Sequence, residues 1–136
     1  MFFKKDENKE NNFLIKVCAL LIHAAKIDQD YTDKEEEIIK RTIEELVLEK
    51  EKVSKIIQEA KTMEENSNQI LDFTKEVKNM DANKKIEIVE NLWRIVYSND
   101  EADIYETSLM RKLAGLLYID SDVMGNIKTK IKKEYS

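Results

Sequence analysis

The stretch AAKIDQDYTDKEEEII, residues 24–39, joins the end of one apolar segment to the start of an amphipathic one. Thr32 is a residue type that caps helix N-termini, and Glu35 follows three positions later, which is the spacing of a capping box. Apolar residues then recur at helical spacing, beginning with Ile39 and Ile43. The stretch therefore predicts a helix that ends, a short acidic connection, and a second helix that starts at Thr32.

Turn-forming residues are scarce in this 136-residue chain, which has no proline and two glycines, Gly115 and Gly125. Sheet proteins of this size usually need more of them, so the scarcity predicts helices joined by short polar connections. The predicted fold class is all-α: a compact single-domain bundle of about seven helices over residues 13–135, preceded by a flexible N-terminal tail, residues 1–12. The helices are expected near 13–26, from Thr32, across 53–63, 70–77 and 82–98, from Asp103, and from Asp120 or Ser121.

The segment 33–65 allows two interpretations. Apolar positions there alternate spacings of four and three residues, which is the seam of a coiled coil, and neither glycine nor proline interrupts them. Lys50 and Glu64 also fall on that seam, and charged residues at those positions count against one long helix. We expect two helices, with a single helix over 33–65 as the alternative.

Several classes of protein are disfavoured by the composition. The net charge of −5 argues against general nucleic-acid binding. Cys18 is the only cysteine, which excludes an internal disulfide and fits a reducing cytoplasm. The most apolar run, residues 13–25, is broken by Lys16 and His23 and is shorter than the ~20 residues that a membrane span needs. We therefore expect a cytoplasmic protein with a buried core helix and no membrane insertion.

Catalytic motifs are missing from the sequence. His23 is the only histidine, and Cys18 lies about 140° from it around a helix of ~3.6 residues per turn, so the two cannot pair as base and nucleophile. No glycine-rich phosphate loop and no serine-nucleophile motif appears. We therefore expect no enzyme activity, with His23 as a helix-packing or helix-end residue and Trp93 as a core residue between the repeats described next.

An internal repeat relates residues 21–39 to residues 92–110 with a constant offset of 71 residues. Each copy is an apolar helix, a polar connection and a capped amphipathic helix. The paired polar positions are Asp28 with Asn99, Asp30 with Glu101, Thr32 with Asp103, and Glu35 with Glu106. The repeat predicts two helical hairpins related by a pseudo-twofold axis, an arrangement that would bring both polar connections to one end of the molecule.

The segments LLIHAAKIDQDYTDKEEEIIKRTI, residues 20–43, and VENLWRIVYSNDEADIYETSLMRKLAGLL, residues 89–117, resemble the two signature segments of the tellurite-resistance protein B (TerB-like) family. The resemblance implies a compact all-α domain of about seven helices, a bacterial response to tellurite and other chemical or phage stress, and a divalent metal held where the acidic residues of both segments cluster. One departure matters: Asn99 stands where the family pattern has aspartate, which removes a negative charge from that cluster.

Two of the acidic residues near the connections, Glu35 and Glu106, have a purely structural explanation. Glu35 and Glu106 each stand three residues after an expected N-cap, Thr32 and Asp103, where a glutamate completes a capping box. The positive end of the helix dipole also favours a carboxylate there. Both glutamates are therefore explained without any ligand.

The remaining acidic residues support a metal site. Asp28, Asp30 and Glu101 follow helix C-termini, where a carboxylate is unfavourable by about 0.3–1 kcal/mol. Clustered carboxylates need a counter-charge, which a hard cation such as Ca²⁺ or Mg²⁺ supplies. An EF-hand loop is excluded because its sixth position, counted from Asp28, is Asp33 and its twelfth is Ile39. The hypothesis assigns Asp28, Glu35, Asn99 and Glu106 as metal ligands, supported by Asp30, Glu101 and Asp103.

Two interpretations of function remain open. In the first, the chain is a non-enzymatic TerB-like stress-response module whose acidic cluster binds a divalent cation and mediates contact with a protein partner. In the alternative, it is a metal-free helical adaptor or scaffold that acts through helix-groove or coiled-coil contacts.

Overall fold

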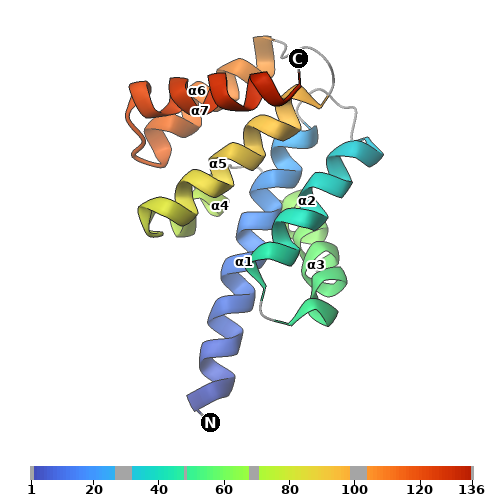
Figure 1. The fold of residues 1–136 in the computed structure, drawn as a ribbon. Helices are drawn as coiled ribbons and strands as arrows, with labels where there is room; N and C mark the ends of the chain where they lie inside the picture. The colour runs from blue at the N-terminus through green and yellow to red at the C-terminus, as the bar shows by residue number, and fades with distance from the viewer. Residues whose placement is uncertain (1, 27–31, 48, 68–70, 99–103, 136) are drawn as a thin grey trace.

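The computed structural model describes residues 2–26, 32–47, 49–67, 71–98 and 104–135, with side chains placed in those ranges except at 2–11, 76 and 104–106 (Figure 1). These residues form seven α-helices, one short 3-10 helix and no β-strand. The α-helices are α1 (Phe2–Lys26), α2 (Asp33–Leu46), α3 (Val53–Asn66), α4 (Leu71–Lys78), α5 (Ala82–Tyr97), α6 (Ile104–Leu116) and α7 (Ser121–Glu134), and the 3-10 helix is η1 (Lys50–Lys52). The predicted all-α class is confirmed, whereas the pseudo-twofold relation of two hairpins stays a prediction.

The C-terminal half of α1 is the centre of the bundle. It packs against α2, α3, α4 and α5. Consecutive residues from Val17 to Ile22 are buried, so this part of the helix is enclosed on every side. The apolar run 13–25 is therefore a core helix, as expected. None of the helices that the structure describes is both long and apolar enough to cross a bilayer.

The first helix is longer than the sequence analysis predicted. It begins at Phe2 instead of near residue 13, so residues 2–12 are helical, and its first turns extend beyond the other helices (Figure 1). The boundary at residue 13 was wrong because it was placed where apolar periodicity starts. Lysine and glutamate favour helices, and no proline or glycine stops the helix among residues 2–12. The expected flexibility of this segment stays a prediction.

The segment 33–65 is two helices, so the alternative of a single long helix is wrong. α2 ends at Leu46, and Val47 is extended with φ −89° and ψ 140°. The 3-10 helix η1 then precedes α3, and Lys50 is exposed in it. The apolar seam nevertheless predicted the burial of Ile39, Ile43, Val53 and Ile57, because α2 and α3 both pack against α1.

The helix starts follow the predicted caps where the structure describes them. Thr32 and Glu35 form a complete capping box at α2. Asp81 caps α5, accepting a hydrogen bond from the Lys84 amide at 3.1 Å. Asp120 occupies the N-cap position of α7 but its side chain makes no capping bond. The predicted cap Asp103 lies outside the described residues.

Candidate functional site

Glu35 lies at the start of α2 with its side chain fully buried, at 0% exposure. Its Oε1 atom accepts hydrogen bonds from the Thr32 amide at 2.8 Å and from the Thr32 hydroxyl at 3.0 Å. In return, the Glu35 amide donates to Thr32 Oγ1 at 3.2 Å. A buried carboxylate is costly without such donors. Thr32 therefore fixes both the start of the helix and the orientation of the buried carboxylate.

The other predicted metal ligands cannot be placed relative to Glu35. Glu106 belongs to the first turn of α6, but its side chain is outside the described set. The remaining members of the predicted site lie outside the described residues altogether: Asp28, Asp30, Asn99, Glu101 and Asp103. Among the residues that the structure does describe, no group of three or more histidine, cysteine, aspartate or glutamate side chains is arranged to hold a metal ion. The meeting of the two acidic connections therefore stays a prediction.

A buried carboxylate that the sequence analysis did not assign to the site lies beside the end of α1. Glu64, in the last turn of α3, is 9% exposed. Its Oε2 accepts from the Lys26 ammonium at 2.7 Å, and its Oε1 lies 3.3 Å from His23 Nδ1. Lys26 is the last residue of α1 and His23 is one turn earlier, so this cluster adjoins the first acidic connection. The expectation that His23 is a helix-packing or helix-end residue is confirmed.

The signal that could have identified Glu64 was already in the sequence. It occupies a position of the apolar seam, where a carboxylate is buried unless the helix turns it away. Such a residue needs a cationic partner from a neighbouring helix. Periodicity does not reveal which neighbour supplies it, because Lys26 is 38 residues away in the sequence.

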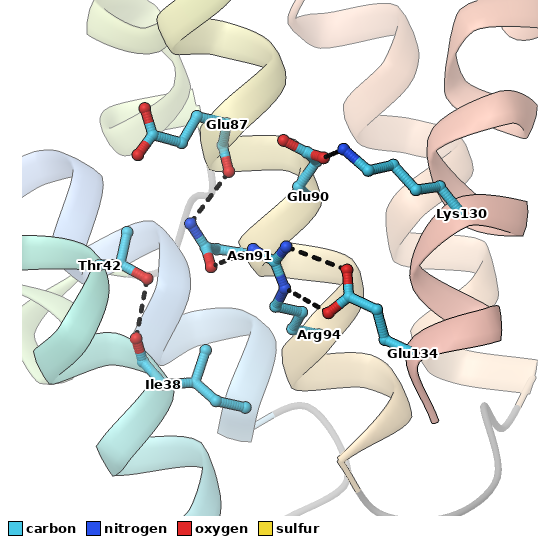
Figure 2. A network of polar contacts seen from close by, with 8 residues as sticks. All are labelled: Ile38, Thr42, Glu87, Glu90, Asn91, Arg94, Lys130 and Glu134. Carbon is cyan, nitrogen blue, oxygen red and sulfur yellow. Dashed lines mark hydrogen bonds and ion pairs between the residues drawn. The ribbon is translucent and has the colours of Figure 1, made fainter. Parts of the chain in front are cut away.

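A polar cleft of about 610 Å³ lies between α2, α5 and α7. Figure 2 shows the charged side chains that α5 and α7 contribute to it. Arg94 on α5 forms a bidentate pair with Glu134 on α7, with both N–O distances at 3.1 Å, and it also donates to Asn91 Oδ1 at 2.9 Å. One turn away, the Lys130 ammonium pairs with Glu90. Most of the charge in the polar cleft is thus used to join α7 to α5.

Two carboxyl groups of the polar cleft interact with each other across α2 and α5. Burial, then a hydrogen bond with the Glu45 carboxyl and the charges of Glu45 and Glu90, raises the pKa of Glu87 above its ordinary value. Two carboxyl groups can share a hydrogen bond only when one of them holds a proton. By contrast, the hydrogen bond from Arg94 lowers the pKa of Glu134. The polar cleft thus contains both a proton-binding pair and a fixed ion pair.

The single thiol, on Cys18, is buried and unreactive. Cys18 is buried in the centre of α1, and burial raises its pKa to about 12. A thiol with so high a pKa holds almost no thiolate at neutral pH and is a poor nucleophile. Cys18 is therefore a core residue.

The described residues define a class of protein: an all-α helical module of seven α-helices. A family model, described as tellurite resistance protein TerB, matches residues 14–129. The chain therefore belongs to the TerB family, and the resemblance of residues 20–43 and 89–117 to that family is confirmed. No curated protein and no solved structure matches the chain.

Proposed function

We propose that this chain is a non-enzymatic stress-response module of the TerB family that binds a divalent cation at its acidic connections and contacts a protein partner through that loaded face. Family membership supports the connection with stress. The observation that carries the cation site is Glu35, a fully buried carboxylate at the first acidic connection. Its rigid hold by Thr32 is the kind of preorganisation that a ligand residue needs.

The proposed ligands are Asp28, Glu35, Asn99 and Glu106, surrounded by Asp30, Glu101 and Asp103. All of them offer oxygen atoms, which hard cations such as Ca²⁺ and Mg²⁺ prefer. Asn99 contributes a neutral amide oxygen, so the site carries less negative charge than one with aspartate there, and its affinity is correspondingly lower. We place the module in the cytoplasm, where its single unpaired cysteine suits the reducing conditions.

The first experiment measures thermal unfolding of chelator-stripped protein before and after Ca²⁺, Mg²⁺, Mn²⁺ or Zn²⁺ is added back. A cation that binds only the folded state raises the unfolding temperature, by an amount that grows with its concentration relative to Kd. We expect millimolar Ca²⁺ or Mg²⁺ to raise it. If no cation changes the unfolding temperature, the cation site is refuted and the metal-free adaptor is the better interpretation.

A pair of variants distinguishes the role of Glu35 in cation binding from its role in the capping box. Glu35→Gln keeps a side chain that can complete the capping box but removes its charge, so it should fold and lose the cation response. Glu37→Gln makes the same charge change at an exposed position of the same helix and should retain the response. Loss of the response in both variants would point to a general charge effect.

The partner is tested with the same pair. Affinity capture from cells exposed to tellurite is compared for the natural chain with and without chelator, and for Glu35→Gln against Glu37→Gln. A partner that is retained by Glu37→Gln and lost with both chelator and Glu35→Gln supports the proposal. Equal capture by all four samples contradicts a cation-dependent face.

A further inference from the structure

The C-terminal helix α7 is attached to the rest of the molecule mainly through α5. Three side chains of α7 are buried: Met124, Ile127 and Ile131. Trp93 of α5 is buried there too and donates its indole N–H to Met124 Sδ at 3.2 Å. Most of the contact that holds α7 is therefore presented by one helix of the bundle, and any copy of the chain presents the same surface.

Polar contacts make that attachment specific. The Arg94–Glu134 and Glu90–Lys130 pairs both run from α5 to α7 (Figure 2). The Lys128 ammonium lies 5.5 Å from the centre of the Trp93 ring, again from α7 to α5. These contacts fix the register of α7 on α5 and would form equally well if the two helices came from different copies.

The connection between α6 and α7 is short and strained. It covers residues 117–120, and Tyr118 in it has φ 56°, the only positive φ outside glycine among the described residues. A tyrosine in this left-handed conformation is disfavoured because its Cβ crowds the backbone. Short loops under strain favour exchange of the element that they tether.

The composition of the connection allows it to become helical. Residues 117–120 include no proline and no glycine. The side chain of Asp120 makes no capping hydrogen bond, so the start of α7 is not locked by its N-cap. The Tyr118 side chain is 73% exposed, and its described contact is with the Lys78 ammonium, 5.0 Å from the ring centre. Straightening the connection would therefore relieve the strain at Tyr118, while the buried Leu117 and the partly buried Ile119 would have to repack.

We propose that two copies of this chain exchange α7, with α6 and α7 joined through residues 117–120 into one continuous helix that places α7 on α5 of the second copy. The exchanged dimer keeps every contact between α5 and α7 described above. It loses the left-handed conformation at Tyr118 in both copies, and this loss favours the dimer. The inference does not depend on the proposed cation site.

The decisive experiment uses two charge-reversed chains. One carries Glu90→Lys and Arg94→Glu on α5, and the other carries Lys130→Glu and Glu134→Arg on α7. In each chain alone, like charges face each other across α5 and α7, whereas in the exchanged mixed dimer every pair is again opposite in charge. Each chain keeps its natural net charge, so simple attraction between oppositely charged proteins does not contribute.

The two chains are unfolded, mixed and refolded, then analysed by size-exclusion chromatography with light scattering and by native mass spectrometry. We expect a one-to-one mixed dimer that forms in excess over either homodimer. The chain with all four substitutions restores the pairs internally and is the folding control. A mixture that contains no mixed dimer, while the four-substitution control folds, overturns the proposal.

The strained connection gives an independent test in the otherwise natural chain. Tyr118→Gly removes the left-handed strain at both connections of the dimer, so the dimerisation constant measured after refolding should fall about tenfold or more. Tyr118→Ala keeps the strain and removes the ring contact with Lys78, so its dimerisation constant should not fall. If both variants lower dimerisation equally, the strain is not the cause and the mechanism is wrong.

Discussion

At the scale of single residues, the start of α2 shows how one threonine supplies the hydrogen bonds of a buried glutamate. Thr32 donates two hydrogen bonds to Glu35 Oε1 and accepts one from the Glu35 amide. A carboxyl group on a side chain that is 0% exposed needs such hydrogen-bond partners. Thr32 is therefore as important to the proposed cation site as to the helix, even though it is not among the proposed ligands.

Replacing this threonine tests its contribution. Thr32→Ala removes the N-cap acceptor and one donor to Glu35, so it should lower the free energy of unfolding by about 1–2 kcal/mol. The measurement is urea denaturation followed by circular dichroism. Thr62→Ala is the matched control, because that exposed hydroxyl bonds only to the Gln58 carbonyl of its own helix. An equal loss in both variants would contradict the role given to the cap.

Residue-scale features were the most predictable from the sequence, because capping depends on neighbours three positions apart. Thr32 and Asp81 could be assigned as caps in this way, and the structure confirms both. The buried ion pair of Glu64 could not be predicted in this way, since its partners Lys26 and His23 lie on another helix. The five predicted site residues outside the described ranges stay predictions.

At the scale of elements, α2 and α5 are joined by a contact that depends on protonation. Glu87 of α5 has a raised pKa, caused first by burial and then by its hydrogen bond with Glu45 of α2. The folded state therefore holds this proton more tightly than the unfolded state. The stabilisation is fully present below the ordinary glutamate value of 4.5 and is lost as the pH rises through the raised folded-state pKa.

A glutamine at this position should remove that dependence. Glu87→Gln can donate a hydrogen bond to Glu45 at any pH, so its stability relative to the natural chain should increase from pH 4 to pH 8. The effect should be small, because water screens a pair that is only partly buried. Urea denaturation across this pH range measures it. In a Glu45→Gln background the same substitution should give a smaller increase, because burial and Glu90 still raise the pKa of Glu87 there. An unchanged difference would contradict the pairing.

The boundaries of elements were less predictable than their existence. Apolar periodicity located the core-facing parts of the helices but missed the first turns of α1, which have no apolar pattern to follow. It also left open whether 33–65 was one helix or two. The break after Leu46 arises because α2 and α3 both fold back against α1, a contact that no local pattern contains.

At the scale of the whole molecule, we expect the core not to require the first turns of α1. Among the side chains that the structure describes, the buried cluster starts at Leu14, and the earlier turns of the helix extend past the other helices (Figure 1). A chain that starts at Asn12 should therefore unfold within a few degrees of the full chain. Differential scanning calorimetry of both chains checks this, and a fall of ten degrees or more would show that residues 2–11 belong to the folded core. The result would also test the predicted boundary between a tail and a domain over 13–135.

The position of Trp93 gives the molecule an optical property. This single tryptophan stacks on Tyr97, with ring centres 5.8 Å apart, and is covered by Met124 and Lys128 of α7. Indole emission moves to longer wavelength when water reaches the ring. Departure of α7 from α5 would thus produce a red shift without any added dye, and re-docking on the same chain or on a second copy would reverse it. The emission wavelength of Trp93 therefore reports the dissociation of α7 from α5 in the natural protein.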